Sequence, residues 1–488
     1  MATAQLQQQD LLIGGEWVGA KSDRRFEKDD PFTGDVAGSA AAAGREDAKA
    51  AADAAAAAFP EWGSTPPSAR RELLQKAAGL LMERAEEIAA TVTAETGGTF
   101  GWGMFNCKLA AGMLGEAAAQ TTAVTGEVIP SDVPGLTAFG IRQPAGVVLG
   151  IAPWNAPVIL GTRAVATPLA FGNTVILKAS EVCPRTHGAI AAAIHDAGVP
   201  AGAINLLTHE AQDAPEVVDE LIAHPAVRRV NFTGSSRVGR LVAENAARHL
   251  KPVLLELGGK APMVVLPDAD LDEAVMAANF GAFMHTGQIC MATERLVVDS
   301  SVAEEFTDKL AERAASMKVG DPHDPETQIG PLVSEDSLQR VTELIEDATS
   351  KGAEAVAGGE ADGKLLPPTV LKGVTPEMRV YYEESFGPVV GVISVDGVEE
   401  AIEVANDTEY GLAAAVFGKD VPTALDVASQ IESGICHVNG ATVHDEPQMP
   451  FGGVKASGYV RFGGKAAIDE FTELRWITVQ EGSRHYPI

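Results

Sequence analysis

Gly146-Val147-Val148-Leu149-Gly150-Ile151, followed by Ala152-Pro153-Trp154-Asn155, is the stretch of sequence that decides the fold. A short apolar run that ends in a proline-containing turn predicts a buried strand. The surrounding segment 143–162 carries no charge and has the length of a membrane span. Three prolines and three glycines interrupt that segment, and a long helix does not survive such a pattern. We therefore expect a strand of an interior sheet.

Apolar runs and helical stretches alternate on both sides of this strand. Downstream we expect strands at 173–178, 203–207, 227–232 and 252–256, and helices near 185–197, 214–222 and 236–248. Such alternation is typical of a parallel sheet with crossover helices. Upstream, 68–98 has helical spacing that ends at Gly97-Gly98, and the alanine-rich stretches 40–60 and 109–119 predict surface helices.

A second series of the same kind begins near residue 262. It comprises expected strands at 262–266, 389–394 and 413–417, and expected helices at 271–284, 302–316 and 398–406. Two further segments, 122–143 and 470–480, alternate like isolated strands and predict an extended ribbon. A ribbon of this kind is exposed unless it pairs with another subunit, so we expect a homodimer or a homotetramer.

Composition limits the function classes. A chain of 488 residues exceeds one ordinary core, so more than one domain is expected. A net charge of -30 argues against nucleic acid and anionic membranes as partners, because both repel acidic surfaces. Four irregularly spaced cysteines form no disulfide framework, and Met1–Asp10 contains neither a basic start nor an apolar run. We therefore expect a cytoplasmic protein.

Three residues carry the groups that a reaction at a carbonyl carbon needs: a nucleophile, a base and an oxyanion donor. Cys290 follows the polar, flexible run Thr286-Gly287-Gln288, which suits a presented thiol, although a lone cysteine is most often a small buried hydrophobe. Glu256 ends the apolar run 253–255, where burial would raise its pKa and make it a base; a salt-bridged acid is the alternative. The Asn155 amide is able to hold an oxyanion.

Polar groups also follow other expected strands. Phe232-Thr233-Gly234-Ser235-Ser236 joins a strand to a helix whose free N–H groups favour a phosphate, although a plain helix cap explains the serines equally well. Lys178-Ala179-Ser180-Glu181 places a cation and a carboxylate at another strand end, where they bind ribose hydroxyls or form a surface ion pair. No metal-ligand pattern is present.

These motifs resemble the aldehyde dehydrogenase superfamily from about residue 12 to 480. The matching stretches, in family order, are Pro153-Trp154-Asn155, Lys178 with Glu181, Phe232-Thr233-Gly234-Ser235, Glu256-Leu257-Gly258-Gly259-Lys260, Gly287-Gln288-Ile289-Cys290, Glu384-Ser385-Phe386-Gly387-Pro388 and Pro450-Phe451-Gly452-Gly453. The resemblance implies a Rossmann-like NAD-binding domain (1–121 and 145–258), an α/β catalytic domain (259–455), and an oligomerisation ribbon with a C-terminal tail (122–144 and 456–488).

The resemblance also implies a mechanism. Cys290 attacks an aldehyde, the Asn155 amide and the Cys290 backbone N–H hold the oxyanion, hydride leaves to a nicotinamide, and Glu256 activates the water that hydrolyses the thioester. Glu256 argues against transfer to coenzyme A, because family members that make acyl-CoA generally lack this carboxylate. The implied cofactor residues are Trp154, Lys178, Ser180, Glu181, Gly234, Ser235, Leu257, Glu384 and Phe386. A carboxylate facing the adenosine ribose favours NAD, with some NADP tolerated.

The substrate is expected to be an aromatic aldehyde. The stretches 178–187 and 444–450 look most like those of benzaldehyde, vanillin and salicylaldehyde dehydrogenases. Arg163, where many relatives for aliphatic aldehydes have an aromatic residue, is able to stack on a ring, although a solvent-facing position is its alternative. Phe451 and Trp102 are candidate aromatic walls, and Trp102 alternatively belongs to the core. An aliphatic aldehyde or semialdehyde dehydrogenase, or a non-catalytic relative, remains as a rival.

The chain departs from the family at one position. Val460 in Ser457-Gly458-Tyr459-Val460-Arg461 stands where a glycine is common in the family. A β-branched residue is strained there if the backbone needs a positive φ.

Overall fold

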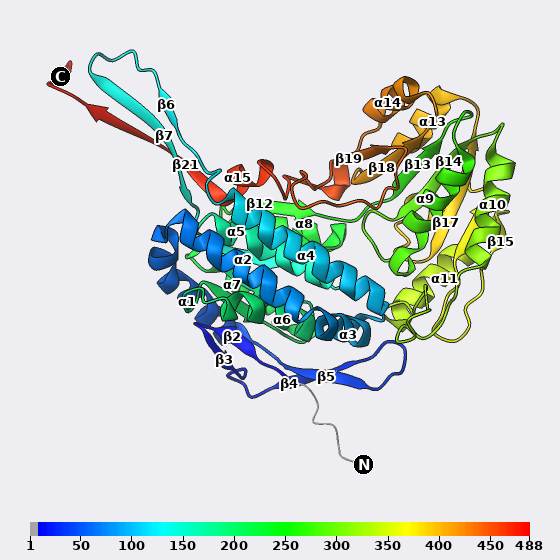
Figure 1. The fold of residues 1–488 in the computed structure, drawn as a ribbon, viewed down its shortest axis with the longest axis horizontal. Helices are drawn as coiled ribbons and strands as arrows, with labels where there is room; N and C mark the ends of the chain where they lie inside the picture. The colour runs from blue at the N-terminus through cyan, green and yellow to red at the C-terminus, as the bar shows by residue number, and fades with distance from the viewer. Residues whose placement is uncertain (1–7) are drawn as a thin grey trace.

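The computed structural model describes residues 8–488, so the first seven residues of the Met1–Asp10 stretch lie outside it. Two α/β lobes and a β-ribbon that extends away from them make up the molecule (Figure 1). The first lobe is built on an eight-stranded sheet. Its strands are, in spatial order, β20 (Gly458–Tyr459), β12 (Val253–Glu256), β11 (Val227–Thr233), β8 (Val147–Ile151), β9 (Thr174–Lys178), β10 (Ile204–Leu207), β2 (Leu11–Ile13) and β3 (Glu16–Val18).

The five central strands of this sheet have the order of a Rossmann fold. Strands β9 and β10 lie on one side of β8, and β11 and β12 lie on the other. All five strands are parallel. The chain therefore reverses its direction of winding between β8 and β11, and such a switch point opens a crevice at the carboxyl ends of the strands. The five predicted strands are confirmed to within one residue at each end.

Eight helices belong to the first lobe. They are α1 (Arg45–Ser64), α2 (Pro67–Glu83), α3 (Ala85–Thr96), α4 (Phe100–Gln120), α5 (Pro157–Ala170), α6 (Pro184–Asp196), α7 (Ala214–Ala223) and α8 (Ser236–Arg248), with a short 3₁₀ turn, η1 (Ala211–Asp213), before α7. The helical stretch predicted over 68–98 is two helices, because Arg84 leaves helical geometry at φ -100° and ψ 7°. Gly97 ends α3 in the left-handed conformation, as a glycine C-cap does.

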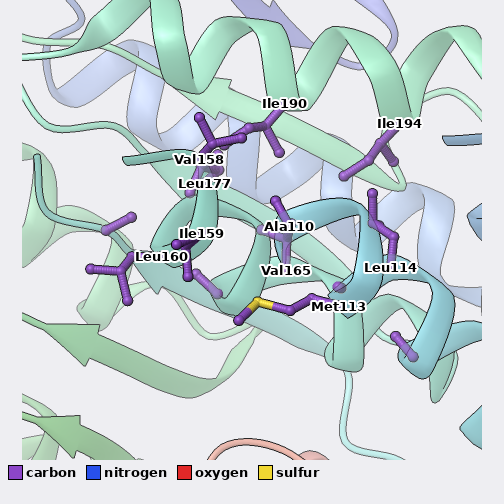
Figure 2. Close-up of a cluster of buried hydrophobic side chains, with 14 of the residues drawn as sticks. Ala110, Met113, Leu114, Val158, Ile159, Leu160, Val165, Leu177, Ile190 and Ile194 are labelled. Atoms are coloured by element: carbon purple, nitrogen blue, oxygen red, sulfur yellow. The ribbon is translucent and has the colours of Figure 1, made fainter. Parts of the chain in front are cut away.

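The prediction of alanine-rich surface helices is half right. The helices are present, but many of their alanines are buried, among them Ala51, Ala55, Ala110 and Ala118. Small side chains let a helix approach its neighbours closely, so the alanines serve the core rather than the surface. Figure 2 shows Ala110 and Leu114 of α4 with Val165 of α5 and Ile190 and Ile194 of α6 in one such apolar cluster.

The second lobe is built on a seven-stranded sheet. Its strands are, in spatial order, β15 (Glu354–Ala357), β16 (Thr369–Lys372), β17 (Val389–Val395), β14 (Thr293–Asp299), β13 (Ala261–Val265), β18 (Ala413–Phe417) and β19 (Ile435–Val438). Its helices are α9 (Leu271–Phe283), α10 (Ala303–Ala315), α11 (Glu335–Ser350), α12 (Arg379–Tyr382), α13 (Val398–Asn406) and α14 (Val421–Gln430), with the 3₁₀ turn η2 (Met284–Gly287) after α9. Every strand predicted in this lobe is present; only β15 runs antiparallel to its neighbour.

The remaining strands form two small sheets. Strands β6 (Glu127–Ile129), β7 (Leu136–Pro144) and β21 (Thr472–Gln480) form the predicted ribbon, and β7 pairs with β21 along its whole length. The turn η3 (Lys455–Ser457) and the helix α15 (Ala466–Phe471) precede β21 in the chain and connect the ribbon to the first lobe. Strands β1 (Gln8–Gln9), β5 (Val36–Ala41) and β4 (Arg25–Asp29) form the other sheet.

Over residues 8–488, no helix combines the length and the apolar character that crossing a membrane requires. Over the same residues, no cluster of three or more His, Cys, Asp or Glu side chains is placed to hold a metal ion. All four cysteines are unbridged.

Candidate active site

A cavity of about 280 Å³ lies at the switch point of the first sheet and extends to the second lobe. The carboxyl ends of β8, β11 and β12 supply one side of it, and loops of the second lobe supply the other. The lining residues are Pro153, Trp154, Asn155, Thr233, Gly234, Ser235, Glu256, Leu257, Gly258, Cys290, Ser337, Arg340, Glu384 and Phe386. The structure thus brings together the thiol, the carboxylate and the amide that the sequence singles out.

Asn155 is tied directly to the loop that carries the cysteine. Its side-chain Nδ2 donates a hydrogen bond of 3.1 Å to the carbonyl of Gln288, two residues before Cys290. The Asn155 carbonyl in turn accepts a bond of 3.0 Å from the indole Nε1 of Trp102. Asn155 is only 4% exposed. The amide is therefore held in one orientation beside the Cys290 loop.

The loop before Cys290 is rigid, and the expectation of a flexible polar run is wrong. His285, Thr286 and Gly287 have consecutive positive φ angles of 50°, 56° and 71°. The first two have side chains, which makes this backbone strained. Thr286 and Gln288 are buried, and their side chains bond to the Gly330 carbonyl at 3.2 Å and the Val333 N–H at 3.0 Å. The polar side chains fix the loop from within.

An aromatic stack joins this loop to Asn155. The His285 ring lies parallel to the Trp102 indole, with centroids 4.8 Å apart. Burial lowers the pKa of His285 to about 3, so its imidazole is neutral. Trp102 is 5% exposed, belongs to the apolar core and holds Asn155 from behind. It does not line this cavity, and neither do the other two predicted substrate residues, Arg163 and Phe451.

Glu256 is fully buried and Cys290 is partly buried, and both ionisable groups line the same cavity. Burial raises the pKa of Glu256 to about 8, against a smaller lowering by the charge of Arg163. Neither carboxylate oxygen has a hydrogen-bond partner in the described chain. Burial, followed by the charges of Glu256 and Glu384, holds the pKa of the Cys290 thiol well above its usual range. Both groups are therefore mainly neutral at pH 7, and the ionised fraction of Glu256 is the proton acceptor for the thiol.

Two glycines after Glu256 permit the close approach of three segments. A Cβ on Gly258 would lie 2.6 Å from Glu384 Oε2, and one on Gly259 would lie 2.4 Å from the Cys290 carbonyl oxygen. The Gly259 N–H donates to Glu384 Oε1 at 2.9 Å. Glycine at both positions therefore lets the end of β12 contact the cysteine loop and the Glu384 loop together.

A buried ion pair anchors the Glu384 loop. Lys260 Nζ contacts Glu294 Oε2 at 2.5 Å, and both side chains are buried. The Glu294 carboxylate also accepts from the Ser385 N–H at 2.8 Å, the Ser385 hydroxyl at 2.7 Å and the Phe386 N–H at 3.2 Å. This network fixes Phe386 at a positive φ of 49°, with its ring edge-on to Trp154 at 5.8 Å.

The cavity also has a cradle for an anionic cofactor. Ser235 caps α8, its hydroxyl accepting from the Val238 N–H at 3.3 Å, so the start of that helix faces the cavity. A Cβ on Gly234 would lie 2.6 Å from the Phe232 ring. The start of α8 suits an anionic phosphate, whereas glycine at 234 leaves room for the Phe232 ring.

The residues predicted to hold an adenosine ribose lie next to this cavity and do not line it. Lys178 ends β9, the neighbour of β8, and Ser180 and Glu181 follow it. Burial lowers the pKa of Lys178, and the charge of Glu181 opposes that lowering. They sit at the carboxyl end of the same sheet, on the far side of β8 from β11.

Arg163 is buried, so the solvent-facing alternative is wrong. Its side chain is 7% exposed and forms an ion pair with Asp445, whose side chain is 9% exposed. The guanidinium lies over the Phe451 ring, 4.1 Å from the centroid. Phe451 belongs to the same apolar cluster as Trp102, and Cys290 packs against that cluster.

Val460 has a φ of 69°, so the strain expected from replacing glycine is present. Its carbonyl accepts a bond of 2.7 Å from Arg461, and its side chain packs against the main apolar cluster. None of the cavity-lining residues is involved.

Sequence patterns did not predict several residues that line or support the site. Arg340 lines the cavity and holds the backbone carbonyls of Glu384 and Ser385 at 2.7 Å each, from a helix (α11) that no motif marked. No function was predicted for Asp445, although it lies in the stretch 444–450 that resembles the dehydrogenases of aromatic aldehydes. For Lys260, the only available signal was its place at the end of the Glu256 motif.

Comparison with known proteins identifies this arrangement. The model of the aldehyde dehydrogenase family matches residues 17–477. The chain belongs to this family. It is an enzyme, and the family uses NAD(P).

Several proteins are similar over almost their whole length. A vanillin dehydrogenase of Pseudomonas sp. (strain HR199 / DSM 7063) is 57% identical over 478 residues, covering 98% of this chain and 99% of the relative. A benzaldehyde dehydrogenase [NAD(+)] of Pseudomonas putida is 42% identical, covering 94% of both chains. The crystal structure of a salicylaldehyde dehydrogenase from Pseudomonas putida G7, complexed with salicylaldehyde, superimposes with a TM-score of 0.97 at 44% identity, covering 99% of this chain and 100% of that one.

Proposed function

We propose that this enzyme oxidises an aromatic aldehyde to its carboxylic acid with NAD, through a thiohemiacetal and a thioester on Cys290. The observation that carries the proposal is the meeting of Cys290, Glu256 and Asn155 at one cavity that also contains the start of α8. A nucleophile, a base and an oxyanion donor at a dinucleotide crevice are the parts that this reaction needs.

The first half of the reaction forms a covalent bond at sulfur. The Cys290 thiol gives its proton to Glu256, and the sulfur attacks the carbonyl carbon. The carbonyl oxygen becomes an oxyanion, which Asn155 Nδ2 and the Cys290 N–H stabilise. NAD, when bound beside Trp154, Glu384 and Phe386, would supply the acceptor for the hydride of the former aldehyde carbon. Collapse of the oxyanion then leaves a thioester on Cys290.

The second half releases the acid. Glu256 first releases to solvent the proton that it took from Cys290. Ionised Glu256 then takes a proton from a water molecule as the water oxygen adds to the thioester, and it returns this proton to the Cys290 sulfur as the carbon–sulfur bond breaks. A carboxylate with a pKa near 8 is a stronger base than an exposed glutamate and is still ionised in part at neutral pH. Hydrolysis, and not transfer to coenzyme A, follows from the presence of this base.

The preference for NAD over NADP rests on Glu181. A carboxylate near the adenosine ribose accepts hydrogen bonds from a 2′-hydroxyl and repels a 2′-phosphate. Lys178 and Ser180 beside it supply donors for the same sugar. Comparing kcat/KM for NAD and NADP tests this assignment, and higher efficiency with NADP would contradict it.

The aromatic substrate is supported by Arg163 and Phe451. The guanidinium stacked on Phe451 forms a flat, polarisable pair with it, and Phe451 belongs to the apolar cluster against which Cys290 packs. The relatives that carry aromatic aldehydes in their names agree with this choice. A semialdehyde needs a free cation for its carboxylate, and Arg163 is already neutralised by Asp445.

The ribbon supports assembly into a homodimer or a homotetramer. Trp476 and Leu474 of β21 are 75% and 65% exposed, and Val128 of β6 is 71% exposed. An apolar ribbon of this kind is covered in a stable oligomer. The unbridged cysteines agree with a reducing cytoplasm. Light scattering of the purified protein gives the subunit number.

The deciding experiment is an aldehyde panel with both cofactors, followed by NADH absorbance. Benzaldehyde derivatives are expected to exceed short aliphatic aldehydes in kcat/KM, and Cys290→Ala is expected to abolish the signal. Faster oxidation of aliphatic aldehydes, or of semialdehydes, would overturn the assignment of substrate class.

A further inference from the structure

A buried serine connects the segment that follows Glu256 to the second lobe. Ser457 ends the turn η3 and has no exposed surface. Its hydroxyl donates a hydrogen bond of 2.6 Å to the Gly258 carbonyl and accepts one of 3.0 Å from the Gly411 N–H. Its own carbonyl accepts a bond of 3.0 Å from the Leu257 N–H. One residue therefore holds the two cavity-lining positions after Glu256 and joins them to the loop before β18.

The Glu256 carboxylate has no hydrogen bonds of its own to hold it. Its side chain is buried, and neither carboxylate oxygen has a partner within residues 8–488. Its position is therefore set by its backbone, at the end of β12. On one side β12 pairs with β11, and on the other it pairs with β20, which consists of Gly458 and Tyr459 alone. Ser457 directly precedes this short strand, so Ser457 and β20 together support the outer side of Glu256.

Two glycines allow the turn to lie directly against β12. Gly458 has a φ of 112°, and a Cβ there would lie 2.0 Å from the Leu255 carbonyl oxygen. A Cβ on Gly453 would lie 2.5 Å from the Ser457 Cβ. The backbone around Ser457 is thus close enough to bring its hydroxyl between the two lobes.

The link reaches the part of the second lobe that contacts the cysteine loop. A Cβ on Gly259 would lie 2.4 Å from the Cys290 carbonyl oxygen and 3.5 Å from the Leu412 Cβ. Leu412 follows Gly411, the residue that Ser457 holds. The base belongs to the first lobe and the nucleophile to the second, so their separation depends on contacts of this kind. A displacement of about 1 Å in a reacting group is able to cost about 100-fold in rate.

We infer that Ser457 is a positioning residue for Glu256: its hydroxyl joins the segment after this base to the second lobe, and so fixes the carboxylate relative to the Cys290 thiol. This inference rests on the proposed function and adds the contact that aligns the two lobes at the reacting groups. Without the hydroxyl, the end of β12 is expected to move more freely and to expose the carboxylate to water.

The test compares the pH dependence of kcat in Ser457→Ala and in the wild type, with benzaldehyde and saturating NAD. The variant is expected to lose about tenfold or more in kcat. The pH at which kcat reaches half its plateau is expected to fall, because water replaces part of the burial that raises the pKa of Glu256 to about 8. A purely structural role of Ser457 would lower the melting temperature and leave kcat and its pH dependence unchanged.

Denaturation gives a second readout that needs no turnover. The folded wild type binds the Glu256 proton more tightly than the unfolded chain, so this group costs stability as the pH rises from 5 to 9. In Ser457→Ala the loss of stability over this interval is expected to be smaller than in the wild type. The contributions of the other titrating groups cancel in the comparison. An equal loss in the two proteins would contradict the inference.

Ser433→Ala is the matched control. The Ser433 hydroxyl likewise donates to a backbone carbonyl of the second lobe, that of Ile435 at 2.8 Å, and it does not line the cavity. This variant is expected to keep the wild-type kcat and its pH dependence, because the segment after Glu256 retains all its bonds.

Ser457→Cys keeps a similar volume and a weaker donor, so it is expected to lie between the wild type and Ser457→Ala in both readouts. If Ser457→Ala does not fold, the cysteine variant is measured in its place. Failure of both variants to fold would assign Ser457 to the fold alone and overturn the inference.

The outcomes separate the two proposals. Absence of NADH formation by the wild type with every aldehyde would overturn the proposed function, and the denaturation comparison would still decide whether Ser457 holds Glu256. An active wild type together with unchanged kcat and pH dependence in Ser457→Ala would overturn the role of Ser457 alone.

Discussion

Replacing Glu256 by glutamine is expected to stabilise the protein while it stops turnover, because both effects arise from one buried carboxyl group. The pKa of this group is 4.5 in an exposed setting and about 8 in the fold. The folded state therefore binds the proton more tightly than the unfolded state, and stability falls as the pH rises from 4.5 to 8. Glutamine does not titrate, so the variant escapes this loss.

The magnitude follows from linkage. Each pH unit between the two pKa values costs about 1.4 kcal/mol, so the wild type loses about 3 kcal/mol relative to the variant by pH 7. The loss reaches its full value, about 5 kcal/mol, only above the folded pKa of about 8. Chemical denaturation of both proteins at pH 5, 7 and 9 measures the difference. Any constant cost of burying the amide cancels when the three values are compared.

The same variant is expected to slow both halves of the reaction, because Glu256 takes the proton of the Cys290 thiol in the first half and that of water in the second. Rapid mixing with aldehyde and NAD is expected to show slower formation of NADH, and the steady-state rate is expected to fall by about 10²- to 10⁴-fold. In the wild type the steady-state rate is expected to rise with pH toward a plateau above about 8. The reasoning is refuted if the stability difference does not grow with pH, or if the variant turns over at the wild-type rate.

Three other substitutions test residues that surround or support the Glu256 site. Asn155→Ala is expected to lower kcat by about 10²- to 10³-fold, as loss of an oxyanion donor does, and stopped-flow rates of NADH formation should locate the loss in the step before hydrolysis. Glu294→Gln leaves Lys260 as a buried charge without its partner and is expected to destabilise the fold by about 3–5 kcal/mol in urea titrations; an unchanged midpoint would show that the pair is dispensable. Val460→Gly relieves a positive φ and is expected to raise stability by about 1 kcal/mol with kcat unaltered, whereas a lower melting temperature would mean that packing of the valine outweighs its strain.

The sequence was most informative where one local pattern determines the structure. The strand at 147–151 and the four others around it follow from short apolar runs between turns, and their ends fix where Glu256 and Ser235 lie. The positive φ at Val460 could be foreseen from a single substituted glycine.

Features that depend on long-range packing could not be predicted from local sequence patterns. The break at Arg84 occurs without a proline or glycine, and the rigidity of the loop at 285–288 comes from partners that are more than forty residues distant in the chain, such as Gly330 and Val333. The burial of Arg163 depends on Asp445, 282 residues away. Periodicity reports only local neighbours, so such pairs appear first in three dimensions.

The tightly packed turn before Cys290 has a consequence for engineering new activities in this enzyme. Thr286 and Gln288 are packed and bonded on all sides, so random replacement there would mostly produce unfolded or inert enzymes. The segment 443–450 is more open at Met449, which is 46% exposed, and replacement there is expected to cost less, whereas Asp445 in the same segment is held by Arg163. A library built on that outer loop would explore which aldehydes are admitted while the chemistry beneath it stays intact.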